Sequence, residues 1–178
     1  LGHGQLELFL TGENNWRKTI LPTYKANRVG KRKPMLLNFL RDWMQSELKA
    51  VLEDGLEADD LLGIHATSDP DNTTIVSEDK DIKAKRITKF EADYNHMLQT
   101  LTGDTVDGYA GCPTIGPKTA EKILKDCTTT AQLWEATLAA FKKQKLSEEV
   151  ALVQAQVARI CRATDFDTTT RKVIPWMI

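Results

Sequence analysis

Three groups of carboxylates stand at short, regular spacings in the middle of the sequence. They are Glu57, Asp59 and Asp60; then Asp79 and Asp81; then Asp104 and Asp107. Acids three residues apart share a face when they open a helix, as in the first and third groups. Acids two apart point to one side of an extended chain, as in the second group. Each group can therefore present paired oxygen ligands in one direction.

The elements expected around these groups place them at one edge of a sheet. We predict strands at residues 6–10 and 73–76, and helices at 35–53, 59–67 and from Thr88 to about 102. This alternation indicates an α/β core with a parallel sheet. Sites in such folds form at the carboxyl ends of the strands, so we expect the groups to meet there. The last third of the chain is predicted to be mostly helical, at 119–125, 131–143 and 147–163.

Seven carboxylates at one edge would repel one another unless cations lay between them. Oxygen ligands favour Mg²⁺ or Mn²⁺ over zinc, and two such ions about 4 Å apart can activate water and stabilise the leaving oxygen of a phosphodiester. The plainer interpretation is that these acids cap helices or form a solvated face. It is the better one for any group taken alone, but three groups beside a basic segment favour metal binding.

The basic segment, residues 16–34, is expected to be part helix and part mobile loop. From Arg17 to Lys33 it contains seven cations and no acid. Lys25 and Arg28 could hold phosphates, together with Arg17, while Trp16 and Tyr24 could stack on bases at a frayed DNA end. The alternative, weighed equally, is a solvated loop whose two rings lie in the core.

A glycine-rich loop at 111–118 leads into the helix predicted after it. Gly111 and Gly116 allow close backbone approach, amides at a helix start can face a phosphate, and Lys118 adds a charge. An ordinary helix–helix turn is the competing interpretation.

Composition excludes several other classes of protein. The 178 residues are 41% hydrophobic and 28% charged, with a net charge of −1, which is typical of a globular enzyme. The three cysteines are scattered, which argues against a disulfide framework or a zinc site and favours a reducing cytosol. We expect no membrane association, since no apolar stretch approaches the roughly 18 residues that a span requires.

Taken together, these motifs resemble the 5′→3′ exonuclease/flap-endonuclease family, and most closely its branch in short-tailed phages. The resemblance covers nearly the whole chain in order and spacing. The segments that carry it are 15–18 (NWRK), 24–28 (YKANR), 56–60 (LEADD), 77–81 (SEDKD), 103–111 (GDTVDGYAG) and 115–120 (IGPKTA).

The resemblance implies a PIN-like parallel sheet flanked by helices, with a helix–two-turn–helix DNA-binding lobe. The nuclease core would span residues 1–102 and include the arch segment at about 16–34. The helix–two-turn–helix region and the C-terminal helices would span 103–178. All seven carboxylates would surround two divalent metal ions, and Lys25 and Arg28 would contact the scissile phosphate from the arch. The loop would grip duplex DNA through Gly111, Ile115, Gly116, Lys118 and Thr119, in many members around a potassium ion.

Two departures from the family pattern concern the first metal site. The family has an aspartate on its first strand, but no acid precedes Leu6, so we expect that strand to lie outside this chain. A second aspartate usually ends the strand before the arch, where this sequence has Gly12 followed by Glu13.

The sequence therefore predicts a monomeric 5′→3′ exonuclease acting on duplex or flap DNA in phage replication, in the host cytoplasm. Removal of RNA from RNA–DNA hybrids is a further expectation. The alternative is a structure-selective DNA-binding module that has lost cleavage, which the two departures favour. A PIN-type ribonuclease is disfavoured because such domains generally lack the glycine loop.

Overall fold

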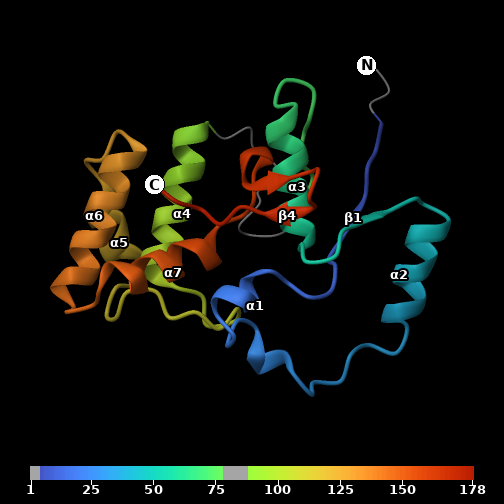
Figure 1. The fold of residues 1–178 in the computed structure, drawn as a ribbon, viewed down its shortest axis with the longest axis horizontal. Helices are drawn as coiled ribbons and strands as arrows, with labels where there is room; N and C mark the ends of the chain where they lie inside the picture. The colour runs from blue at the N-terminus through green and yellow to red at the C-terminus, as the bar shows by residue number, and fades with distance from the viewer. Residues whose placement is uncertain (1–4, 78–87) are drawn as a thin grey trace.

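The computed structural model describes residues 5–77 and 88–178, and its elements gather into two ends joined by a middle (Figure 1). One end holds α4 to α7, the other holds β1, β2 and α2, and α3 lies between them beside the C-terminal hairpin. The helices are α1 Arg17–Ile20, α2 Leu37–Ser46, α3 Ala58–Ser68, α4 Lys89–Thr102, α5 Pro117–Leu124, α6 Thr130–Lys143 and α7 Glu148–Ala158. Two 3-10 turns, η1 Ala26–Arg28 and η2 Ala163–Asp165, complete the helical elements of the described residues.

The helical end contains the largest core cluster. Fully buried Met97 and Leu101 of α4 meet Leu124 of α5 and Phe141 of α6, and alanines of α7 close the cluster. The helix α4 begins as predicted, because Thr88 and Glu91 form a reciprocal capping box. Leu101 and Cys112, on either side of residues 102 and 103, both belong to this core. The domain boundary expected between 102 and 103 stays a prediction.

Parallel pairing is present but short. Strand β1, Phe9–Leu10, pairs in parallel with β2, Val51–Leu52. Residues 51–52 were predicted to be helical, which is wrong: α2 ends at Ser46, and Lys49 adopts a positive φ of 56° that turns the chain into β2. The strand predicted at 73–76 is also wrong, since residues 73–77 have no regular structure and Val76 is exposed.

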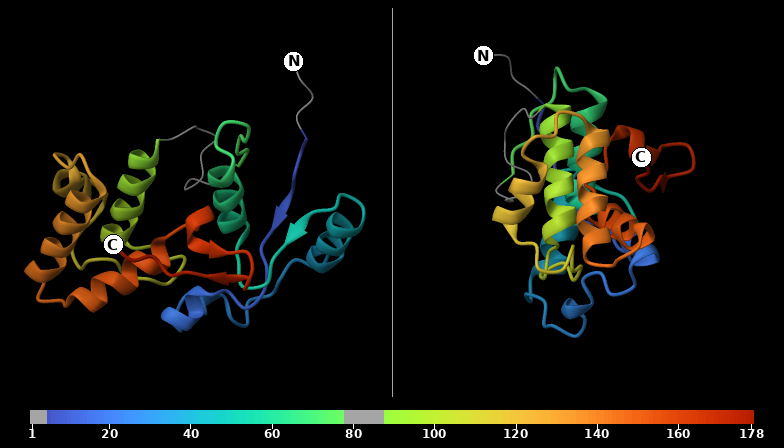
Figure 2. Two further views of the ribbon diagram at one scale, coloured as in Figure 1. Left: turned by 45° about the horizontal axis from the view of Figure 1, so that its top comes forward. Right: turned by 90° about the vertical axis from the view of Figure 1, so that its left-hand side faces the viewer.

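Helix α2 lies apart from the helical end, at the far side of the molecule (Figure 2). Among the apolar side chains in and just before this helix, Leu36, Phe39 and Trp43 are all exposed. In residues 5–77 and 88–178, no helix is long and apolar enough to cross a bilayer.

The C-terminal segment differs from the predicted helix at 147–163. Helix α7 ends at Ala158, and the chain continues through η2 into an antiparallel hairpin of β3, Phe166–Asp167, and β4, Lys172–Val173. At this end, the carbonyls of Val157 and Arg159 accept hydrogen bonds from the Arg17 side chain. A side chain from the N-terminal part of the sequence therefore satisfies carbonyls at the end of this helix.

The loop after β1 packs so closely that only glycine fits at position 12. The Gly12 N–H donates to the Leu56 carbonyl over 2.8 Å. A Cβ at this position would lie 2.0 Å from the Glu53 carbonyl oxygen. The family's aspartate at this place is therefore incompatible with this packing.

Substituting Gly12 by alanine should destabilise the protein. We expect Gly12→Ala to lower the free energy of unfolding by about 1–3 kcal/mol, because the new methyl overlaps backbone that must move. Gly116→Ala is the control, since its Cβ would meet nothing within 4 Å. Urea denaturation measures both variants, and equal stabilities would contradict the close packing.

Candidate functional site

Four of the predicted metal ligands line one small pocket. The pocket has a volume of about 40 Å³, and its walls include Glu57 and Asp59 at the start of α3, and Asp104 and Asp107 from the turn after α4. Carboxylates from two distant parts of the chain therefore meet, as the sequence predicted. Asp79 and Asp81 lie outside the described residues.

The start of α3 divides its three acids between two directions. Glu57 is the N-cap, and its N–H donates to Asp60 Oδ2 over 3.2 Å within a capping box. Asp59 and Asp60 lie in the first turn, where the helix dipole favours negative charge. Glu57 and Asp59 reach the pocket, whereas Asp60 points into the core with no exposed surface.

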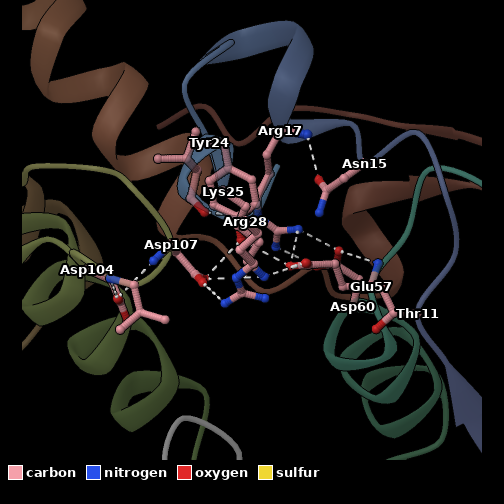
Figure 3. Close-up of polar contacts among 12 residues, drawn as sticks. Thr11, Asn15, Arg17, Tyr24, Lys25, Arg28, Glu57, Asp60, Asp104 and Asp107 are labelled. Carbon is pink, nitrogen blue, oxygen red and sulfur yellow. Dashed lines mark hydrogen bonds and ion pairs between the residues drawn. The ribbon is translucent and has the colours of Figure 1, made fainter. Parts of the chain in front are cut away.

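The turn that carries Asp104 and Asp107 is shaped by Asp104 itself. Asp104 Oδ1 accepts hydrogen bonds from the N–H groups of Val106, at 2.7 Å, and Asp107, at 3.1 Å. Gly108 follows with φ of 79°, and the chain closes through paired hydrogen bonds between Asp104 and Tyr109. The turn directs the Asp107 carboxylate towards Glu57, as Figure 3 shows.

Arg17 and Asp60 form a buried bidentate ion pair behind the pocket. Both guanidinium–carboxylate distances are 2.7 Å, and Trp16 Nε1 and the N–H of Cys161 also donate to Asp60. Burial alone would raise the pKa of Asp60, but Arg17 and the backbone donors hold it below its usual value. Every oxygen of Asp60 is thus used inside the protein, which contradicts its predicted role as a metal ligand.

Residues predicted to bind DNA from the basic segment are partly in the core. Trp16, Arg17 and Tyr24 are each at most 9% exposed. Tyr24 packs beside Tyr109, and the Arg17 guanidinium lies over both the Trp16 and the Tyr24 rings. This burial contradicts the predicted DNA contacts of all three and supports the alternative in which the rings lie in the core.

Lys25 and Arg28, in contrast, reach the pocket carboxylates (Figure 3). Lys25 Nζ lies 2.5 Å from Glu57 Oε1 and 3.5 Å from Asp107 Oδ2. Arg28 Nη2 lies 2.9 Å from Asp107 Oδ1. The Tyr24 hydroxyl lies between the two acids, 3.0 Å from Glu57 and 3.1 Å from Asp107, and its burial raises the pKa of this phenol. Two acids and two cations therefore face each other at the pocket.

The donors at this pocket fit a hard divalent cation by their chemistry. Four carboxylates are the ligands that Mg²⁺ and Mn²⁺ prefer. Even so, no three acidic, histidine or cysteine side chains of residues 5–77 and 88–178 converge closely enough to hold an ion. Between Glu57 and Asp107, the carboxylate oxygens contact the Tyr24 hydroxyl, Lys25 and Arg28.

The glycine-rich loop exposes only part of its predicted DNA-binding set. Gly116, Lys118 and Thr119 are exposed around an open hollow of about 400 Å³ at the start of α5. Ile115 is half-buried against the helical core. Gly111 is buried and its N–H donates to the Gln154 side chain over 2.8 Å, which contradicts its predicted contact with phosphate.

Some pocket and loop residues were missed from the sequence. Gln99 and Tyr109 line the pocket, and Gln154 of α7 holds the Gly111 amide. Gln99 lies one turn before the end of α4, and Tyr109 lies in the same motif as Asp104. Both positions could therefore have been predicted from the sequence to lie near the pocket. No feature of the sequence predicts the hydrogen bond between Gly111 and Gln154.

Removing the Arg17 side chain should leave the buried Asp60 carboxylate without a counter-ion. We expect Arg17→Met to lower the free energy of unfolding by about 3–5 kcal/mol at pH 7, because Asp60 loses its counter-ion. Arg32→Met, which removes an exposed arginine of the same segment, is the control.

The deficit should shrink as the pH falls. In the unaltered protein the Asp60 pKa is depressed, so its contribution is present above about pH 4 and is lost on acidification. In Arg17→Met the unpaired carboxyl gains a proton and the variant recovers. Urea denaturation between pH 7 and 3.5 measures this, and a deficit that does not change with pH would contradict the assignment.

Comparison with known proteins gives relatives that include exonucleases and flap endonucleases. No family model matches the chain. The exodeoxyribonuclease of Enterobacteria phage T3 is 29% identical over 219 residues, covering 95% of this chain and 72% of that protein. The flap endonuclease Xni of Vibrio atlanticus is 30% identical over 187 residues, covering 87% and 72%. The alignment with the T3 protein is longer than this chain, so that relative has internal segments without a counterpart here.

A solved structure has a similar fold. The flap endonuclease of bacteriophage T5, determined as a complex with DNA and metal ions, superposes with a TM-score of 0.61 at 16% identity, covering 88% of this chain and 73% of that one. The likeness supports the predicted PIN-like α/β fold. By its sequence relatives, this chain belongs to the 5′→3′ exonuclease/flap-endonuclease family of nucleases.

Proposed function

We propose that this protein is a 5′→3′ exonuclease that hydrolyses phosphodiester bonds at the 5′ ends of duplex or flap DNA. The observation that carries the proposal is the pocket where Glu57 and Asp59 meet Asp104 and Asp107 beside Lys25 and Arg28. Oxygen ligands next to phosphate-binding cations suit a metal-dependent phosphodiesterase. Relatives are named as exonucleases and flap endonucleases.

Two Mg²⁺ or Mn²⁺ ions would be held by the four pocket acids together with Asp79 and Asp81. Ions bound there would supply an activated water and would stabilise the leaving oxygen. Asp60 is left out of this set because Arg17 already uses both of its oxygens. Its part is to fix the start of α3, so that Glu57 and Asp59 face the pocket.

Lys25 and Arg28 bind and orient the scissile phosphate in this proposal. Both side chains reach the pocket from a segment anchored by buried Tyr24. Cations held at a reacting phosphate stabilise the charge that develops in the transition state. Their contribution is therefore to turnover as well as to binding.

Duplex DNA would be held at a distance from the pocket by the start of α5. Gly116, Lys118 and Thr119 are exposed there, and amides at a helix N-terminus suit a phosphate. We assign this loop to the helix–two-turn–helix region expected at 103–178, with a potassium ion as a ligand in keeping with the family resemblance. Action as a monomer on replicating phage DNA in the host cytoplasm, and removal of RNA from RNA–DNA hybrids, belong to the same proposal.

A DNA-binding module without cleavage is the second candidate. The packing around Gly12 favours it, since no acid can stand where the family usually has an aspartate. The neighbouring Glu13 is exposed. Salt-dependent duplex binding without Mg²⁺-stimulated release of nucleotides would establish this candidate instead.

Cleavage should depend on the pocket carboxylates. With 5′-labelled duplex or flap DNA and Mg²⁺, we expect Asp107→Asn to lower the rate of nucleotide release by about a hundredfold or more, because a ligand charge is lost at the reacting phosphate. Asp42→Asn, an exposed acid on α2, is the control and should keep the full rate. Release that is equally fast in Asp107→Asn would refute the site.

Duplex binding should depend on Lys118 through charge. We expect Lys118→Ala to weaken binding of uncleaved duplex in Ca²⁺ similarly for all sequences and to reduce the salt slope by about one. Lys142→Ala, an exposed lysine in the last turn of α6, is the control. An unchanged salt slope would remove this loop from the interface.

A further inference from the structure

Every oxygen of Glu57 and Asp107 already faces a donor from the basic segment. Glu57 Oε1 contacts Lys25 and its Oε2 contacts the Tyr24 hydroxyl. Asp107 Oδ1 contacts Arg28, and its Oδ2 contacts Tyr24 and Lys25. Lys25 and Arg28 thus use the carboxylate lone pairs that a divalent ion would need.

A divalent ion and these side chains exclude each other on electrostatic grounds. An ion bound by Glu57 and Asp107 would lie within a few ångströms of the Lys25 ammonium, and like charges at that distance repel. It would also take the carboxylate oxygens that keep Lys25 in place. One occupant must leave when the other binds.

We propose that Lys25 and Arg28 act as internal counter-ions that occupy the divalent-cation site, and that cation binding releases them to bind the substrate phosphate. This inference rests on the proposed function, because it concerns the same pocket. It adds an order to the binding events: the cation comes first, and the phosphate-binding side chains become available as a result.

The local structure allows the side chains to move without unfolding the segment. The Lys25 N–H donates to the Asp107 carbonyl over 2.7 Å, and Tyr24 is only 2% exposed, so the backbone is anchored at this point. The Arg28 side chain is half exposed, and the Lys25 side chain is 17% exposed. Release is therefore a swing of two long side chains about a fixed backbone.

This exchange couples the two ligands. A cation that frees Lys25 and Arg28 raises the affinity for phosphate, and by linkage phosphate raises the affinity for the cation by the same factor. Removing one of the internal counter-ions should therefore tighten cation binding in the absence of DNA.

Calorimetric titration with Ca²⁺ tests the competition without turnover. We expect Lys25→Met in the full chain to bind Ca²⁺ about fivefold more tightly than the unaltered protein, since a partly buried competing ion pair is gone. Lys18→Met, which removes an exposed lysine of α1, controls for the change in net charge and should shift the affinity less than about twofold. Equal or weaker binding by Lys25→Met would overturn the proposal.

Lysine acetylation of the unaltered protein, followed by mass spectrometry, tests the release directly. We expect the acetylation rate of Lys25 to rise severalfold when Ca²⁺ is added, while that of Lys18 stays the same. A protein that binds Ca²⁺ with no change at Lys25 refutes the internal counter-ions and leaves the proposed function standing. A protein that binds no Ca²⁺ refutes both.

Discussion

The buried ion pair between Arg17 and Asp60 joins three parts of the molecule that are far apart in the sequence. Arg17 comes from the basic segment, Asp60 from the first turn of α3, and the Arg17 side chain also donates to carbonyls at the end of α7. Asp60 in turn accepts from the Cys161 N–H beyond that helix. Because a buried charge is costly without its partner, this contact fixes all three parts relative to one another.

The pocket lies in front of that pair. With Asp60 turned inward, the other two acids of the same group are left at the surface of the helix start, facing the turn that holds Asp107. The basic segment continues from Arg17 to Tyr24, Lys25 and Arg28, whose side chains contact the acids of the pocket. Positioning of the carboxylates and positioning of the cations that oppose them thus depend on one interaction.

Opposite charges from distant parts of the sequence are paired in this arrangement. The basic segment and the acidic groups are separate in the sequence, and in space Arg17, Lys25 and Arg28 form ion pairs with Asp60, Glu57 and Asp107. Such pairing offsets the negative charge of the acids at the pocket. It also places Lys25 and Arg28, which are suited to bind a phosphate, next to acids that are suited to bind a metal.

The sequence by itself determined which residue types would meet at the pocket and where α4 would begin. The capping box at Thr88, the spacing of the acids and the order of the motifs are local features, and local rules read them well. The strand at 73–76 and the helical assignment of residues 51–52 failed, because residues with strong local preferences follow their tertiary neighbours.

Only the tertiary structure decided whether each candidate functional side chain faces the pocket or the core. A spacing of three puts Glu57 and Asp60 near one another at a helix start, but it does not say which of them the core will take. That choice was made by Arg17, forty-three residues away from Asp60. Trp16 and Tyr24 were likewise placed in the core by partners distant in the sequence, since burial is a property of packed neighbours and not of composition.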